Sequence, residues 1–253
     1  MTPARSLIDG LVVFIVIIVL WEAAVAIFEP RAFVLPAPSA IASVLIAEPW
    51  FFVHHASITG LEMVLGLVAA LILGILTASL MALFLPLRRV LLPLVVASQA
   101  LPVFAIAPLL VIWLGFGIAS KVAMATLILY FPITSALYDG LRRADPELLE
   151  VAKLYGASRF KILILVRFPC ALPDLASGIR VAAALAPIGA VVGEWVGAAG
   201  GLGFVMLQAN ARMQTDHVFA SLIVLGLLAV LLRWIADRAA RWLAPWAEER
   251  SFA

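Results

Sequence analysis

Side chains suited to nucleophilic or metal chemistry are few and scattered in this sequence. The histidines His54, His55 and His217 lie at the ends of apolar segments, and Cys170 is the single cysteine. A metal site needs a cluster of such ligands, and a serine hydrolase needs a serine–histidine pair. Ser158 lies in a polar loop, away from every histidine. The sequence therefore predicts no catalytic residue and no metal ligand.

The chain also lacks the common sequence motif for binding the phosphates of a nucleotide. No G-x-x-x-x-G-K-[ST] motif occurs, and this is the loop whose backbone amides cradle the phosphates of a nucleotide. We therefore predict that the chain is not an enzyme, does not hydrolyse ATP and holds no cofactor of its own.

Polar residues inside apolar segments are the better candidates for function, because burying them in a membrane is costly. Ser98 and Gln99 stand inside a long apolar segment and are followed by Pro102, which bends a helix. Glu194 and Trp195 close another such segment. They are candidates for a solute path or gate, although Gln99 could instead bond across helices and Glu194 could sit in interfacial water.

Two stretches near the end of the chain are expected on the outer side. The glycine-rich run 197–203 is predicted to form an outer re-entrant loop, and 208–216 an outer loop before the last helix. Gln208 and Asn210 in the second stretch could line the path, contact a binding protein or simply be solvated. The paired His54 and His55 are expected at the membrane interface.

The elements that position these residues are set by the composition. Of the 253 residues 65% are hydrophobic and 13% charged, against roughly 45–50% and 25% in soluble domains. Hydrocarbon offers the backbone no hydrogen-bond partner, so apolar segments of this length must be helices. An all-α integral membrane protein with six transmembrane helices is predicted, with segments at 7–28, 57–85, 91–114, 122–138, 175–196 and 218–234.

The distribution of Lys and Arg predicts the orientation of the chain. Thirteen of the 17 lie on one side, three lie on the other and Arg180 falls inside a segment. Basic loops face the cytoplasm, so both termini are expected there. The thirteen are Arg5, Arg88, Arg89, Arg142, Arg143, Lys153, Arg159, Lys161, Arg167, Arg233, Arg238, Arg241 and Arg250. These residues do not form one basic face, which argues against a nucleic-acid partner and leaves lipid as the surroundings.

The chain is predicted to have two parts. Residues 1–56 hold the first transmembrane helix and an outer interfacial segment, in which Ser39 could cap a short helix. Residues 57–253 form a five-helix core with a cytoplasmic loop at 139–174. This loop is too short to build a core of its own, so its function requires a partner.

The loop at 139–174 contains a predicted short helix. Asp145 is a suitable N-cap, Pro146 suits the first helical position and Gly156 can end the helix. A second helix is expected to start at Ser158 and to stop before Pro169. The predicted helix that begins at Pro146 is mostly apolar, so it either packs on its own bundle or enters a groove on another protein.

Spacing within this loop resembles that of a known transporter family. Glu150-Val151-Ala152, three residues, Gly156, nine residues and Val166-Arg167-Phe168-Pro169 resemble the "EAA" loop of ABC-importer permeases. That pattern has Ala, Ile and Leu where this chain has Val151, Val166 and Phe168, and these changes keep the apolar character. The resemblance assigns coupling to Glu147, Glu150, Ala152, Tyr155, Gly156, Ala157 and Pro169.

Three further stretches, 35–41, 101–117 and 193–203, are similar to permeases of the nitrate, sulfonate and taurine type. The resemblance implies a type I (MetI-like) transmembrane domain in the bacterial cytoplasmic membrane. It implies a second copy of the chain, separate ATPase subunits that hold ATP and Mg, and a periplasmic or surface-anchored solute-binding protein. Residues 208–216 look similar to permeases for hydroxymethylpyrimidine, a thiamine precursor, while sulfonates, taurine, nitrate and riboflavin-like solutes stay open.

One alternative is a secondary transporter or channel with a similar number of spans. Ion coupling would require charged residues inside the membrane, and the sequence shows few. A second alternative, an intramembrane protease, lacks the serine–histidine pair noted above.

Overall fold

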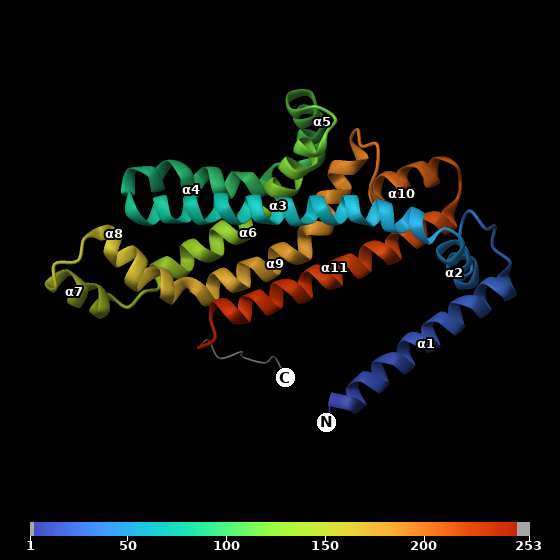
Figure 1. Ribbon diagram of the computed structural model, residues 1–253, viewed down its shortest axis with the longest axis horizontal. Coiled ribbons are helices and arrows are strands. Elements are labelled where there is room, and N and C mark those ends of the chain that lie inside the picture. The colour runs from blue at the N-terminus through green and yellow to red at the C-terminus, as the bar shows by residue number, and fades with distance from the viewer. Residues whose placement is uncertain (1–2, 247–253) are drawn as a thin grey trace.

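The computed structural model describes residues 3–246, and every regular element in that range is helical. In chain order (Figure 1) the elements are α1 (Pro3–Phe28), α2 (Pro38–Ala47), α3 (Pro49–Leu83), α4 (Leu85–Ala100), α5 (Val103–Leu114), α6 (Ile118–Arg142), α7 (Pro146–Leu154), α8 (Arg159–Ile162), the π-helix η1 (Leu163–Arg167), α9 (Phe168–Trp195), α10 (Leu202–Ala211) and α11 (Thr215–Leu243). Arg250, one of the thirteen basic residues expected on the cytoplasmic side, lies outside the described residues.

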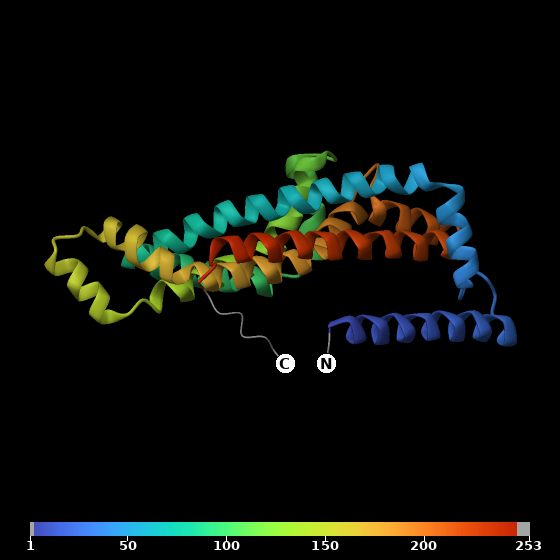
Figure 2. The ribbon, with the colours of Figure 1, turned by 60° about the horizontal axis from the view of Figure 1, so that its bottom comes forward.

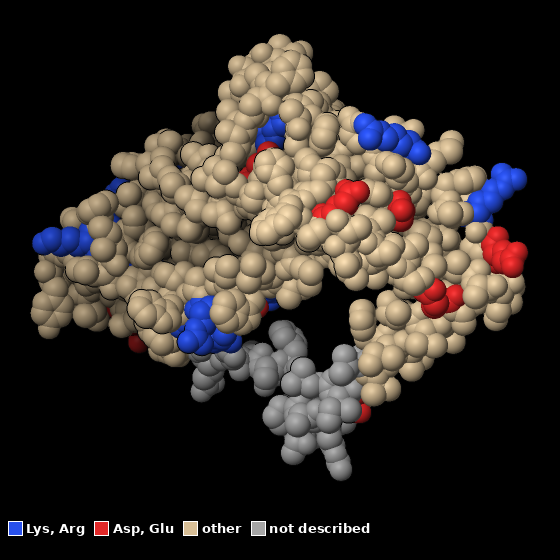
Figure 3. Space-filling model, turned by 45° about the vertical axis from the view of Figure 1, so that its right-hand side comes forward, with Lys and Arg blue, Asp and Glu red and all other residues tan. Residues whose placement is uncertain are grey.

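Helices occur at all six predicted membrane segments, but they differ in length and continuity. In the described range, α3, α6, the continuous helix Arg159–Trp195 and α11 are each long and apolar enough to cross a membrane. The pair α4 and α5 forms a fifth candidate, broken by a bend, and Val12–Phe28 of α1 is a shorter apolar helix. The face in Figure 3 is mostly uncharged, as expected for a surface in contact with lipid.

The core lies where α6 packs between α3 and α9. Buried Leu129, Ile133 and Leu137 of α6 meet the alanines of α9, among them Ala182 and Ala186. Small residues on α9 let the two helices approach closely. A Cβ atom added at Gly189 would lie 2.8 Å from the Cα atom of Ala125, so α6 and α9 touch backbone to backbone here.

The first helix stands apart from this core. Both ribbon views show α1 displaced from the bundle and joined to it through α2 (Figure 2). Its link to α2 is Glu22, which accepts hydrogen bonds from the backbone N–H of Ser39 at 3.0 Å and from its hydroxyl at 2.6 Å. Ser39 therefore does not cap α2 as predicted. The N-cap is Ala37, which is followed by Pro38 at the first helical position.

The predicted membrane segment 91–114 is not a single helix. The chain bends by 105° between α4 and α5, so that α5 projects from the side of the bundle (Figure 1). Pro102 lacks the N–H that would continue α4, and it holds the preceding Leu101 in an extended conformation. The predicted proline bend is thus a full break.

The expected stop before Pro169 is also wrong. The helix that starts at Arg159 runs on to Trp195, and Pro169 lies in the first turn of α9. A π-turn makes this continuity compatible with proline. The N–H of Phe168 bonds to the carbonyl of Leu163, five residues back. In this wider turn the helix continues although Pro169 has no backbone N–H to donate. The non-helical part of the predicted loop 139–174 is therefore confined to the segments flanking α7.

Candidate functional site

Helix α7 is capped at both ends by local contacts. The carboxylate of Asp145 accepts a hydrogen bond from the N–H of Glu147 at 2.9 Å, as an N-cap should. Gly156 has φ +74°, in the left-handed region. The N–H of Ala157 bonds to the carbonyl of Ala152 at 3.0 Å, and that of Gly156 to Lys153 at 2.9 Å. These two bonds form a Schellman motif, so the predicted start and end of the helix are confirmed.

The surface of α7 is apolar and uncovered. None of its residues is buried, and Leu154 and the adjoining Tyr155 are 86% and 88% exposed. Figures 1 and 2 show α7 at one extremity of the molecule, beyond the ends of the long helices. Packing of this helix on its own bundle, one of the two sequence-based explanations, is therefore wrong.

The structure brings six of the seven predicted coupling residues together on α7 and its C-terminal turn. Of these, Ala152 and Ala157 are half-buried and the other four, Glu147, Glu150, Tyr155 and Gly156, are exposed. Pro169 is separate, beyond the π-turn. The base of the loop is closed by an ion pair between Arg143 and Asp174 at 2.9 Å.

A buried polar cluster lies at the opposite end of the bundle, under the N-terminus of α10. Glu194 accepts hydrogen bonds from the hydroxyl of Thr59 at 2.6 Å and from the N–H groups of Gly203 and Phe204. Thr59 in turn accepts from the N–H of Leu202 at 2.8 Å. The free N–H groups that begin α10 are therefore satisfied by side chains of α3 and α9.

His55 completes this cap, because its Nδ1 atom accepts a hydrogen bond from the N–H of Gly201 at 3.0 Å. His55 is buried inside the protein, contrary to the interfacial position expected for it, whereas His54 is exposed. Glu194 is 0% exposed, so its expected place in interfacial water is wrong. Its carboxylate serves as a structural acceptor inside the protein.

Two charged residues of this cluster were missed by the sequence reading. Glu62 is 3% exposed within α3 and interacts electrostatically with Glu194. Lys121, one of the three basic residues assigned to the side opposite the thirteen, is 2% exposed and donates to the carbonyls of Phe116 and Gly197, each at 2.9 Å. A usable signal was the spacing of His55, Thr59 and Glu62, which share one face of a helix.

Four further predicted path residues, Ser98, Gln99, Pro102 and Trp195, lie at or near the break between α4 and α5. Ser98 is half-buried and bonds to the carbonyl of Val95 in its own helix at 2.7 Å. Gln99 and Pro102 are exposed at the break. Trp195 lies against Phe104 of α5, with ring centroids 6.1 Å apart, so the end of α9 and the start of α5 are neighbours.

The predicted outer loop 208–216 is in part the helix α10, which ends at Ala211. Gln208 and Asn210 are exposed on it. Gln208 lines an open cavity of about 540 Å³ between α3, α10 and the start of α11, together with Glu48, His55, Arg212 and His217. The glycine-rich run 197–203 forms the turn that leads into α10.

Residues 70–249 match the family model described as the binding-protein-dependent transport system inner membrane component. The chain belongs to this family. The permease is 43% identical over 231 residues to a probable ABC transporter permease protein of Haemophilus influenzae, covering 91% of this chain and 94% of that one. It is 35% identical to the formylaminopyrimidine transport permease protein ThiX of Halalkalibacterium halodurans, covering 94% and 95%.

The fold of the permease has a counterpart among solved structures. An inward-facing conformation of the MetNI methionine ABC transporter matches with a TM-score of 0.67 and 20% identity, covering 78% of this chain and 98% of that one. The MetI-like fold predicted from the resemblance is confirmed. The permease is a multi-pass inner-membrane subunit of an ABC importer, works with an ATPase and a binding protein, and is not an enzyme. A secondary transporter or channel is thereby excluded.

Proposed function

We propose that α7 is the contact through which the permease couples to a separate cytoplasmic ATPase subunit. The observation that carries this proposal is the exposed apolar surface of Leu154 and Tyr155 on a helix capped at both ends. A short helix whose ends are fixed moves as a rigid body, whereas an uncapped loop would absorb the motion of its partner. Such a surface suits a helix-in-groove contact.

The remaining coupling residues support α7 in this role. Glu147 and Glu150 are the acidic residues on the helix, and Ala152 and Ala157 carry the Schellman bond that fixes its C-terminal turn. ATP and Mg are held by the ATPase. The functional assembly contains a second copy of the permease and has the solute-binding protein at the end of the bundle where α10 lies.

We assign the translocation path to the region around the α4–α5 break. Ser98, Gln99 and Pro102 line this break, and Trp195 closes it from α9 through its contact with Phe104. A broken helix leaves backbone groups unpaired, and these are tolerated in a membrane only next to protein or water. Gln208 faces the outer cavity, which is a suitable entry for solute. Asn210 is exposed two residues further along α10 and could contact the binding protein.

For the solute we favour an aminopyrimidine precursor of thiamine. The support is the 35% identity to ThiX over nearly the whole chain, together with the similarity of residues 208–216 noted above. The test is uptake of radiolabelled formylaminopyrimidine by cells that express the permease with its ATPase and binding protein. Uptake of taurine or an alkanesulfonate without uptake of the pyrimidine would refute this assignment.

Coupling through α7 can be tested by site-specific crosslinking in the assembled transporter. Cys170 is the only cysteine and is exposed, so it is first replaced in a Cys170→Ser background. Leu154→Cys carrying a photoreactive label should then crosslink to the ATPase subunit in membrane vesicles. The control is Arg212→Cys, which is exposed beyond α10 at the other end of the bundle and should not crosslink. Labelling of the binding protein by Leu154→Cys would refute the orientation.

A further inference from the structure

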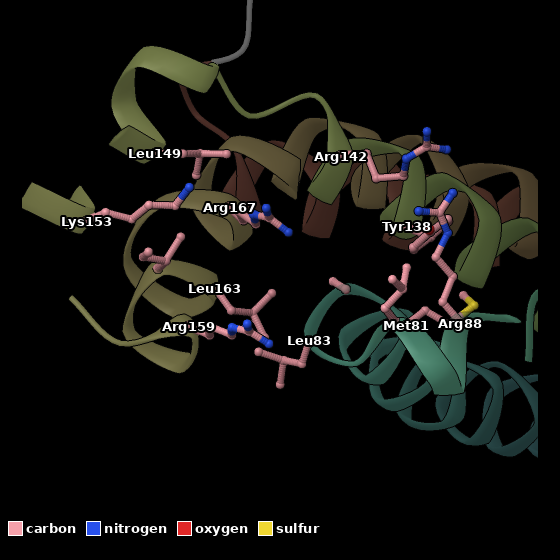
Figure 4. Close-up of a pocket in the computed structure, with 13 residues that line it drawn as sticks. Met81, Leu83, Arg88, Tyr138, Arg142, Leu149, Lys153, Arg159, Leu163 and Arg167 are labelled. Atoms are coloured by element: carbon pink, nitrogen blue, oxygen red, sulfur yellow. The ribbon is translucent and has the colours of Figure 1, made fainter. Parts of the chain in front are cut away.

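A second cavity, of about 290 Å³, lies at the α7 end of the bundle and is surrounded by basic side chains. Figure 4 shows Lys153 reaching it from α7, with Arg88 and Arg142 on the opposite side. Arg159 of α8 and Arg167 of η1 complete the group. Four separate helices thus contribute five cations to the same cavity, two of them from the continuous helix Arg159–Trp195, and none of the lining residues is acidic.

None of these five cations forms an ion pair within the described part of the chain. The guanidinium groups of Arg88 and Arg142 both lie on the ring of Tyr138, at 5.9 and 5.7 Å from its centroid. The Nε atom of Arg167 is buried without a hydrogen-bond partner. Buried donors are almost always paired, so this donor points to a missing acceptor.

The general excess of Lys and Arg in the loops on this side accounts for the presence of cations at this end of the protein. It does not account for five of them lining one cavity. Like charges repel unless an anion lies among them, and the planar guanidinium group matches phosphate oxygens in pairs. The other wall of the cavity is apolar and includes Leu83 and Leu85, which flank the exposed Phe84. Basic pockets of this kind between transmembrane helices bind phospholipid headgroups.

We propose that this cavity binds a phosphate-bearing anion, either the headgroup of an anionic phospholipid or a soluble phosphate. Because Lys153 is on α7 while Arg88 and Arg142 are on α4 and α6, the bound anion ties α7 to the bundle. Occupancy of the cavity therefore stiffens the connection through which, under the proposed function, the ATPase acts. Binding of the anion itself is independent of that function.

The test uses the full-length permease in phosphatidylcholine nanodiscs, with and without phosphatidylglycerol, and native mass spectrometry to count retained phosphatidylglycerol. Inorganic phosphate is titrated in a separate calorimetric experiment in phosphatidylcholine nanodiscs. Arg88→Gln and Arg167→Gln should each weaken binding by about tenfold or more. The matched control is Arg89→Gln, which removes the same charge from the neighbouring exposed position outside the cavity and should bind as the parent does.

Retention of phosphatidylglycerol without a response to phosphate assigns the site to lipid, and the reverse result assigns it to a soluble phosphate. Either result supports binding of a phosphate-bearing anion in the cavity. Equal losses in Arg88→Gln and Arg89→Gln, or no binding of either probe, would overturn the proposal. The proposal would also be overturned if the five cations became protected from arginine- and lysine-specific reagents only after the ATPase is added. An acidic side chain of the partner would then be the counter-ion. Folding of each variant is checked by size-exclusion chromatography, with Arg88→Lys as the conservative substitute.

Failure of this proposal is distinguishable from failure of the proposed function. Lipid or phosphate binding is measured on the permease alone, whereas crosslinking of Leu154→Cys requires the ATPase. If the anion binds but α7 does not crosslink, the cavity is a binding site without a role in coupling. If α7 crosslinks and no anion binds, the coupling proposal stands and the cavity proposal fails.

Discussion

The hydroxyl of Thr59 on α3 donates to the carboxylate of Glu194 on α9 across 2.6 Å, although the two residues are 135 positions apart. The same hydroxyl oxygen accepts the N–H of Leu202 at the start of α10. One side chain thus joins three helices at the end of the bundle opposite to α7. Because both groups are buried, neither can find water as a substitute partner if this side chain is changed.

Thr59→Val should therefore destabilise the permease. The isosteric change leaves a buried carboxylate oxygen and a buried N–H without partners, at a cost of about 2 kcal/mol, or about 5 °C in melting temperature. Thermal denaturation of the detergent-purified protein measures this. Ser57→Ala is the control, because that exposed hydroxyl bonds only within its own helix, to His54. Equal melting temperatures for the two variants would contradict the cap.

Gly156→Val should separate ATP hydrolysis from transport. A Cβ atom at this position meets nothing within 4 Å, so the substitution acts through φ +74° alone, which costs a residue with a side chain about 1–2 kcal/mol. The strain is relieved by opening the turn after α7. We expect ATP hydrolysis to continue while solute uptake into proteoliposomes falls severalfold.

The control for this experiment is Gly115→Val. Gly115 has φ +81° and equally open surroundings, but it lies after α5. Comparable strain there should lower stability without changing the ratio of transport to hydrolysis. A similar loss of coupling in both variants would show that general destabilisation, and not the orientation of α7, causes the effect.

Gly189→Ala should destabilise the core by about 1–3 kcal/mol. The new methyl group would meet the backbone of Ala125, which cannot move as the end of a flexible side chain can. Gly226→Ala is the matched change on α11, where nothing lies within 4 Å, and it should be neutral or slightly stabilising. Unfolding in a denaturing detergent compares the two variants, and equal effects would refute close packing of α6 on α9.

Lys121→Met should cost about 3 kcal/mol or more, because it removes the cation that faces the buried Glu62 and Glu194. Two carbonyl groups, those of Phe116 and Gly197, lose their donor as well. Adding Glu62→Gln should restore part of the stability by removing one uncompensated carboxyl group. A double-mutant cycle on melting temperature measures this coupling, and strictly additive effects would show that Lys121 and Glu62 do not interact.

Features that depend on neighbours in sequence were predictable. Asp145, Pro146 and Gly156 mark the ends of α7 through contacts spanning only a few residues, and the structure places the ends there. The apolar segments likewise imposed helices, because lipid leaves the backbone no alternative. The family pattern in the loop was readable for the same reason, since its elements lie within 20 residues.

Features that depend on which helices meet were not predictable. Glu62, Lys121 and Glu194 form one cluster only because α3, α6 and α9 pack together, and each residue alone had an ordinary interfacial explanation. The five cations of the cavity at the α7 end were counted as a signal of orientation, because only the fold brings them to one place. The positions of the prolines are evident in the sequence. Whether the helix breaks at a proline, bends there or continues through a π-turn depends on the surrounding backbone.

The π-turn at Leu163–Arg167 sets the direction in which α7 points. An α-helix advances about 100° around its axis with each residue, so the one additional residue in this turn rotates everything before it by about that angle relative to α9. Deleting a residue from this turn should leave the membrane helices in place and rotate the apolar side of α7 away from the partner proposed for it. The proposed docking of α7 on the ATPase therefore depends on the length of one helical turn that lies outside α7 itself.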